Sequence, residues 1–169
     1  EFFKTQLRAL VRLAGEYEPG RIRIMFPLIS GIEEFRIARM LVQRMTDRLA
    51  AEGHPVNRDV PLGAMVEVPS SAVMAVELAR EVDFISIGTN DLIQYSLAVD
   101  RSNELVAHLY RPTSPAILRL ISKVVEAGRS EGVPVSMCGE MAADPLMVPV
   151  LLGIGLENFS MNPQSAPVV

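Results

Sequence analysis

The 169-residue sequence has one cysteine, no tryptophan and no surplus of basic residues. A single cysteine excludes a disulfide framework and any metal site built from several thiolates. With 16 Lys and Arg against 20 Asp and Glu, the formal net charge is -4, so the chain offers little to a nucleic acid backbone. No apolar run approaches the roughly 18 residues that cross a bilayer. No signal peptide opens the chain. We therefore expect no nucleic acid or membrane partner and a cytoplasmic location.

Helix-like and strand-like segments alternate along the chain. Hydrophobic residues make up 49% and charged residues 21%, which is typical of a chain with a buried core and excludes a disordered one. The hydrophobic spacing predicts helices at about 4–15, 31–53, 69–81, from 90 onward, 115–131 and 144–153. Short apolar runs predict strands at 21–27, 62–67, 83–88, 134–140 and 158–161.

This alternation predicts parallel strand pairing and an α/β fold. Two architectures fit, an open doubly wound sheet and a (β/α)₈ TIM barrel. Polar or reactive residues follow several of the strands, as the active face of a barrel requires, whereas an open sheet would concentrate them at one switch point. We predict the barrel. Since a complete barrel needs eight strands, about five make this a truncated one, an excised part of a larger protein.

Glu67 and Asp91 follow consecutive predicted strands, where their carboxylates could converge. Two carboxylates with water and substrate phosphate form a typical magnesium site, because Mg²⁺ binds hard oxygen ligands. The alternative is that each acid caps a helix or pairs with an arginine.

The turn Gly88-Thr89-Asn90-Asp91 leads from a strand into a helix, where backbone N–H groups favour an anion. Thr89 or Asn90 could equally be a simple helix cap. Arg101 lies in the loop that follows, and its guanidinium could hold phosphate or carboxylate. A surface ion pair with Asp100 or Glu104 is the alternative for Arg101.

Cys138 ends the fourth predicted strand and is followed by Gly139 and Glu140. Most cysteines are small buried hydrophobes, and a structural role is the simpler interpretation from the residues alone. An ordinary thiol is mostly protonated at neutral pH, so a cysteine in this place could also deliver a proton to a carbanion.

Six segments, in this order along the chain, together resemble the C-terminal region of enzyme I of the phosphoenolpyruvate:sugar phosphotransferase system. They read IRIMFPLI, GAMVEVP, VDFISIGTNDLIQYSLAVDRSNE, HLYRPTSPAIL, MCGEMAADP and LLGIGLENFSM. The resemblance runs from about Phe3 to Pro167 and implies a phosphoenolpyruvate-binding (β/α)₈ barrel. The nitrogen-related paralogue shares these motifs, so the sugar and nitrogen branches both stay open.

The resemblance also implies a reaction and roles for individual residues. The family uses phosphoenolpyruvate and Mg²⁺ to phosphorylate its own histidine, releases pyruvate, and passes the phosphoryl group to the carrier protein HPr. By motif, Glu67 and Asp91 are implied as magnesium ligands, while Asn90, Asp91 and Arg101 are implied to bind the substrate. Cys138 is implied as the acid that protonates the enolate, with Glu140 behind it.

Other implications concern the rest of the protein. Residues 1–169 are expected to be the C-terminal part of the barrel domain, without the phosphohistidine and HPr-binding domains, because neither histidine carries the family's phosphorylation motif. The chain alone is therefore expected to be inactive. A homodimer is expected, since the family's barrel supplies the dimer contact.

Two other functions remain open. One is the phosphoenolpyruvate-binding domain of pyruvate phosphate dikinase or phosphoenolpyruvate synthase, which carries similar motifs. The other is a non-catalytic module for dimerisation or ligand sensing.

Overall fold

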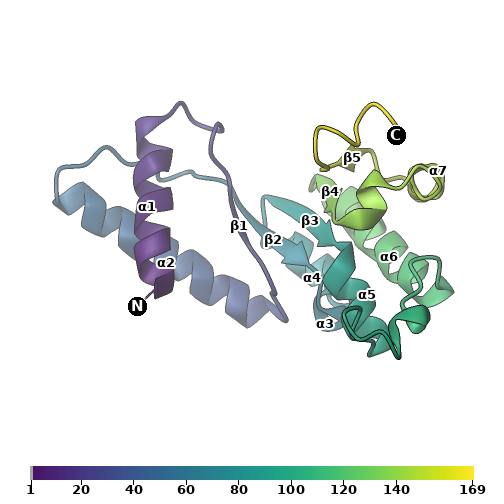
Figure 1. The fold of residues 1–169 in the computed structure, drawn as a ribbon. Helices are drawn as coiled ribbons and strands as arrows, with labels where there is room; N and C mark the ends of the chain where they lie inside the picture. Colours follow the sequence, from purple (N-terminus) through teal and green to yellow (C-terminus); the bar gives the residue numbers. More distant parts are fainter. Residues whose placement is uncertain (1) are drawn as a thin grey trace.

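A single parallel sheet organises the chain. The computed structural model describes residues 2–169, and in that range five strands pair in the order β1-β2-β3-β4-β5 (Figure 1). They are β1 (Ile24–Phe26), β2 (Leu62–Val66), β3 (Phe84–Gly88), β4 (Val135–Cys138) and β5 (Asn158–Phe159). Each strand lies beside the next in the chain with no reversal of order. That order is the winding of a barrel wall and excludes a doubly wound sheet, which needs a switch point. The predicted α/β class and barrel-type winding are confirmed.

One helix precedes β1, and the others connect successive strands. They are α1 (Phe2–Glu16), α2 (Ile32–Ala51), α3 (Pro69–Val73), α4 (Ala75–Ala79), α5 (Thr89–Leu97), α6 (Pro115–Glu131) and α7 (Val148–Ile154), with short 3₁₀ helices η1 (Ala107–Leu109) and η2 (Glu140–Ala143). Parallel strands require such crossover connections, because each chain segment must return to the same end of the sheet before the next strand begins.

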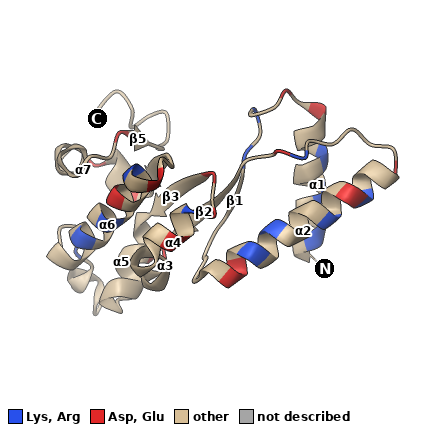
Figure 2. Cartoon of the chain, turned by 180° about the vertical axis from the view of Figure 1, so that it is seen from behind, with Lys and Arg blue, Asp and Glu red and all other residues tan. Residues whose placement is uncertain are grey.

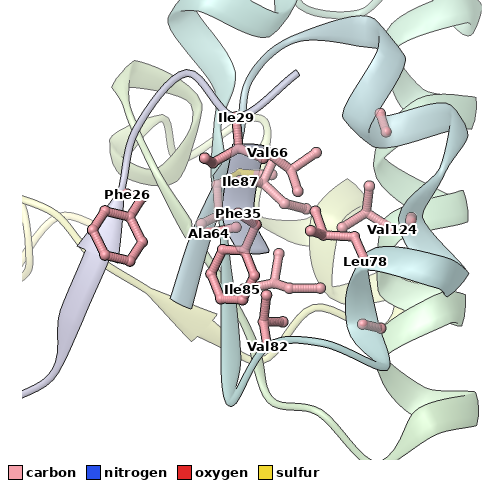
Figure 3. Packing of buried hydrophobic residues seen from close by; sticks show 14 of the residues in the cluster. Phe26, Ile29, Phe35, Ala64, Val66, Leu78, Val82, Ile85, Ile87 and Val124 are labelled. Carbon is pink, nitrogen blue, oxygen red and sulfur yellow. The ribbon is translucent and has the colours of Figure 1, made fainter. Parts of the chain in front are cut away.

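One face of the sheet packs against helices and forms the core. Alternate strand residues point to the same side. On β2 and β3 these are Ala64, Val66, Ile85 and Ile87, all buried. The apolar side of α6 covers this face, and Figure 3 shows Val124 of α6 close to the β2–β3 side chains.

The opposite face is more polar. Met65, Ser86 and Ser136 occupy one level across three strands. Two residues further along, Gly88 pairs with Cys138. Since this parity also places Glu67 on the same face as Met65, the polar face ends in Glu67, Gly88 and Cys138 at the carboxyl ends of the strands.

The first two helices lie together at the β1 end of the sheet, away from α3–α7 (Figure 1). Phe26 of β1 packs edge-on against the fully buried Phe35 of α2, with ring centroids 6.0 Å apart. Acidic and basic residues both occur along α2 (Figure 2). Two of them, Arg36 and Arg39, pair with Glu81 at 2.5 and 3.0 Å and tie α2 to the chain entering β3.

Some predicted boundaries were wrong. The 69–81 helix is two short helices broken at Met74, whose φ of -94° and ψ of 26° leave the helical region. The helix expected from Asp144 begins only at Val148, because the Asp144 carboxylate accepts the N–H of Leu146 at 2.9 Å and holds a turn. No helix within residues 2–169 has the length and apolar content needed to cross a membrane.

Two helical glycines give a matched test of this packing. A Cβ on Gly128 in α6 would lie 2.8 Å from the carbonyl oxygen of Val133, whereas one on Gly153 in α7 would meet nothing within 4 Å. We expect Gly128→Ala to lower the free energy of unfolding by about 1–3 kcal/mol through overpacking. Gly153→Ala should raise it by about 0.5–1 kcal/mol, because alanine favours the helix. Urea unfolding measures both, and equal effects would contradict the packing described for α6.

Candidate functional site

Glu67 follows β2 and is buried, with 5% of its surface exposed. One carboxylate oxygen accepts the main-chain N–H of Leu28 at 2.7 Å. The other packs against Gly88, where an added Cβ would come within 2.5 Å of it. The carboxylate is therefore held by backbone from two neighbouring strand ends, which fixes its position without a cationic side chain.

Asp91 lies in the first turn of α5 and contacts Glu67. Burial raises the pKa of Glu67 above its ordinary value, the Leu28 N–H lowers it, and the neighbouring Asp91 raises it further. The predicted convergence of these two acids is present. The alternative, in which Glu67 caps a helix or pairs with an arginine, is wrong, because Glu67 contacts the Leu28 N–H and Asp91.

Leu28 reaches Glu67 through an unusual backbone conformation. Its φ is 54°, in the left-handed region that leucine rarely adopts. Its side chain is half exposed, so apolar burial does not account for this geometry. The conformation directs the N–H into the site, and strain of this kind gathers at functional sites. Ser70, at the start of α3, donates to the carbonyl of Ser30 at 2.7 Å and holds the same loop.

Cys138 ends β4 on the face that carries Glu67. Its thiol lies 3.6 Å from the carbonyl of Ile87 and 3.6 Å from the hydroxyl of Ser86, both of the middle strand β3. It is half-buried and free. Gly88 lies on β3 between the ends of β2 and β4, and the Glu67 carboxylate and the Met65 sulfur occupy the space that a side chain there would need.

Asn90 and Glu140 join the starts of α5 and η2. The Asn90 side-chain oxygen accepts the Glu140 N–H at 3.2 Å. Thr89 donates to the Cys138 carbonyl at 3.1 Å. The helix cap predicted as an alternative for Thr89 and Asn90 is not formed, because Gly88 is the N-cap and makes no side-chain bond. Gly139, with φ of 98°, allows the close approach, since a Cβ there would lie 3.2 Å from the Asn90 oxygen.

Arg101 lies in the loop between α5 and α6. Its guanidinium is 3.3 Å from Glu140, across from the end of β4. The alternative of a surface ion pair for Arg101 is confirmed, but the partner is Glu140 instead of Asp100 or Glu104. Asp100 accepts from the N–H and hydroxyl of Ser102 at 2.9 and 2.6 Å. Because Glu140 is an exposed carboxylate, an anionic ligand could replace it as the partner of Arg101.

The sequence analysis missed two residues of this region. Tyr110 places its hydroxyl 3.5 Å from the main-chain oxygen of Asn90. Burial raises its pKa, Glu140 and Asp91 raise it further, and Arg101 opposes them. Leu28 acts through its main chain, which no residue pattern reveals. For Tyr110, its place in the HLYRP segment was the one available signal.

The two carboxylates of Glu67 and Asp91 suit a divalent cation that takes its remaining ligands from water and substrate. Glu67 and Asp91 supply hard oxygens, and a cation there would offset the repulsion between them. Among residues 2–169 no group of three or more Asp, Glu, His or Cys residues gathers around one point. The chain alone therefore provides two carboxylates, and water and substrate would complete the shell, as Mg²⁺ prefers.

Residues 1–169 match the family described as PEP-utilising enzyme, PEP-binding domain. The chain belongs to this family. The phosphoenolpyruvate-protein phosphotransferase of Bacillus subtilis (strain 168) is 53% identical over 165 residues, and that of Latilactobacillus sakei is 52% identical. Each match covers 98% of this chain but 28% of the relative, so the chain spans about a quarter of the length of these proteins. The resemblance to enzyme I is confirmed.

Two solved structures show that the fold of this PEP-binding domain recurs elsewhere. A citrate lyase from Burkholderia xenovorans LB400 has a TM-score of 0.62 at 15% identity, and the match covers 95% of this chain and 55% of that one. An HpcH/HpaI aldolase/citrate lyase family protein from Burkholderia cenocepacia J2315 has a TM-score of 0.62 at 18% identity, with 95% and 65% coverage. Both likenesses support the barrel-type winding and concern the fold alone.

The raised pKa of Glu67 predicts a pH dependence of stability. A carboxyl whose pKa is higher in the folded chain binds its proton more tightly there, so stability falls as pH rises from about the ordinary value of 4.5 through the folded value. We expect Glu67→Gln to stabilise the metal-free chain near neutral pH by on the order of 1 kcal/mol. The gain should vanish below the ordinary carboxyl range. Urea titrations with chelator across this pH range measure it.

The exposed Glu104 provides the control for this pH test. Glu104→Gln should leave the pH profile of the wild type unchanged, because this side chain lies in an exposed loop. A Glu67→Gln profile parallel to that of the wild type would show that ionisation of Glu67 costs nothing in the folded chain.

The left-handed conformation of Leu28 predicts an unusual substitution order. Leu28→Gly keeps the N–H and accepts a positive φ, so stability should be retained. Leu28→Val, with a branched Cβ, should lose about 1–2 kcal/mol. If the side chain were what matters, glycine would be worse than valine. Chemical unfolding of the two variants distinguishes these orders.

Proposed function

We propose that this chain is the substrate-binding part of a phosphoenolpyruvate-protein phosphotransferase, enzyme I. The observation that carries the proposal is that Glu67, Asp91 and Asn90 lie together at one end of the sheet. The chain belongs to a family described as a PEP-binding domain. The name borne by the curated relatives supports it. Residues 1–169 would then be the C-terminal part of the barrel domain, with the phosphohistidine and HPr-binding domains elsewhere in the protein.

In this function the substrate lies at the carboxyl ends of β2, β3 and β4, next to Glu67, Asp91 and Cys138. Glu67 and Asp91 would hold Mg²⁺, which when bound neutralises phosphate charge and helps to orient the transferring group. Asn90, in the first turn of α5, lies where main-chain N–H groups favour an anion. Arg101 would exchange Glu140 for an anionic group of the ligand, since a guanidinium forms charge-assisted bonds with phosphate or carboxylate.

Cys138 would supply the proton of the second step. When the bond between phosphorus and the enol oxygen breaks, the phosphoryl group passes to a histidine and leaves the enolate of pyruvate. The S–H bond then breaks as a C–H bond forms at the enolate carbon, giving pyruvate and a thiolate. The contacts of the Cys138 thiol with Ser86 and Ile87 of β3 hold it on the polar face, which also carries Glu67. Glu140 would not contact the reacting atoms and would help to position Arg101 and Asn90, which it contacts.

Further parts of the proposal concern the whole protein. We propose HPr as the phosphoryl acceptor, a homodimer as the assembled state and a cytoplasmic location, where phosphoenolpyruvate is available. The resemblance to enzyme I supports these points. The sugar and nitrogen branches differ in the carrier they phosphorylate, so transfer to either carrier by the full-length protein would separate them.

Calorimetry tests the binding site directly. We expect the chain to bind phosphoenolpyruvate only with Mg²⁺ present, and Asp91→Asn to weaken binding by at least tenfold, because it removes one of two charged ligands. Asp59→Asn is the control, since Asp59 is an exposed acid preceding β2 at the opposite end of the sheet. Equal binding by the wild type and Asp91→Asn would refute the proposed site. In the full-length protein, Cys138→Ala should retain binding and lose pyruvate release.

A further inference from the structure

The loop between α5 and α6 must hold Arg101 over the strand ends. It leaves α5 at Ala98, whose φ is 52°, and the next residue, Val99, is buried. Beyond that point the loop is mostly exposed, and the side chain of Leu105 is 84% exposed. A segment with so little buried surface has little packing energy to fix its course. Its position therefore depends on a few polar contacts.

Two of these contacts involve Arg101 itself. The Arg101 N–H lies 3.4 Å from the side-chain oxygen of Gln94 in α5. Its guanidinium pairs with the exposed Glu140 at 3.3 Å. A ligand that took over the guanidinium would break the second contact, so the loop needs another point of attachment that survives binding.

Tyr110 provides that attachment at the returning end of the loop. Its ring is half-buried and packs against the core. Its hydroxyl reaches back twenty residues to the main-chain oxygen of Asn90 at 3.5 Å. The side-chain oxygen of Asn90 accepts the N–H of Glu140, the residue that pairs with Arg101. The same asparagine thus joins the end of the loop to the partner of the arginine.

The charged groups around the hydroxyl are Glu140, Asp91 and Arg101. Burial and the two acids keep the phenol protonated at neutral pH, against the opposing influence of Arg101. A neutral hydroxyl can donate to a carbonyl without adding to the negative charge of Glu67 and Asp91. Phenylalanine would fill the same space and lack this donor.

We propose that Tyr110 is a positioning residue of the substrate site, whose hydroxyl anchors the 98–110 loop to the start of α5 and so keeps Arg101 in place for the ligand. The inference rests on the proposed function of the site. It gives Tyr110 no contact with the reacting atoms, and its effect reaches the substrate through Arg101.

Kinetics of the full-length protein test this role. Tyr110→Phe should raise KM for phosphoenolpyruvate about threefold to tenfold, the range expected for one hydrogen bond. The kcat should stay within about twofold, because the acids and the thiol are untouched. Tyr95→Phe, which alters a half-exposed tyrosine of α5, is the control and should leave both constants unchanged.

A double-mutant cycle with Arg101→Ala separates positioning from a general structural role. If Tyr110 acts through Arg101, Tyr110→Phe should change KM no further in the Arg101→Ala background. Additive effects would overturn the proposal. So would an unchanged KM in the single variant.

Hydrogen exchange keeps the test independent of the proposed function. In the ligand-free protein, Tyr110→Phe should speed amide exchange in residues 99–109, and exchange in β2 and β3 should stay as in the wild type. Unchanged exchange in the loop would overturn the anchoring role even if KM rises. A wild-type protein that shows no use of phosphoenolpyruvate would end the proposed function, and the exchange result would still decide whether Tyr110 anchors the loop.

Discussion

Glu67 and Asp91 meet at the ends of neighbouring elements, where burial makes ionisation of Glu67 costly and the nearby Asp91 adds to that cost. Much of the nearby backbone accommodates this contact. Leu28 takes a left-handed conformation to donate its N–H, and Gly88 gives up a side chain so that the Glu67 carboxylate fits. The unfavourable ionisation of Glu67 and the strained backbone at Leu28 lower the stability of the ligand-free chain. Binding of a cation, alone or together with an anion, would offset this loss of stability.

The sequence predicted the winding and the convergence of Glu67 and Asp91, because both follow from local patterns. The roles of Asn90, Arg101 and Cys138 came from the family resemblance and stay predictions. Apolar runs separated by helical periodicity give parallel strands, and the carboxyl ends of such strands share one edge. Glu67, Asp91 and Cys138 could therefore be assigned to that edge from their places after strands. The orientation of Glu67 and Cys138 toward one face follows from register, since Gly88 pairs with Cys138 and each strand alternates its side chains. Asp91 reaches the same place from the first turn of α5.

The features that the sequence did not predict depend on main-chain geometry and on contacts between loops. The positive φ of Leu28 has no residue signature, because leucine is not a residue that turns select. The partner of Arg101 could not be found among its sequence neighbours Asp100 and Glu104, because Glu140 lies 39 residues away. The break at Met74 and the late start of α7 arise from local competition between turns and helices, which periodicity does not resolve.

The sequential order of the sheet bears on how the chain acquires its site during synthesis. Each strand pairs with the one made just before it, so the wall can grow in the direction in which the ribosome releases the polypeptide. The acids at 67 and 91 become neighbours once β3 is in place, some fifty residues before the thiol at 138 emerges. A nascent chain would therefore hold the two carboxylates proposed to bind a cation before it contains the thiol proposed to supply a proton.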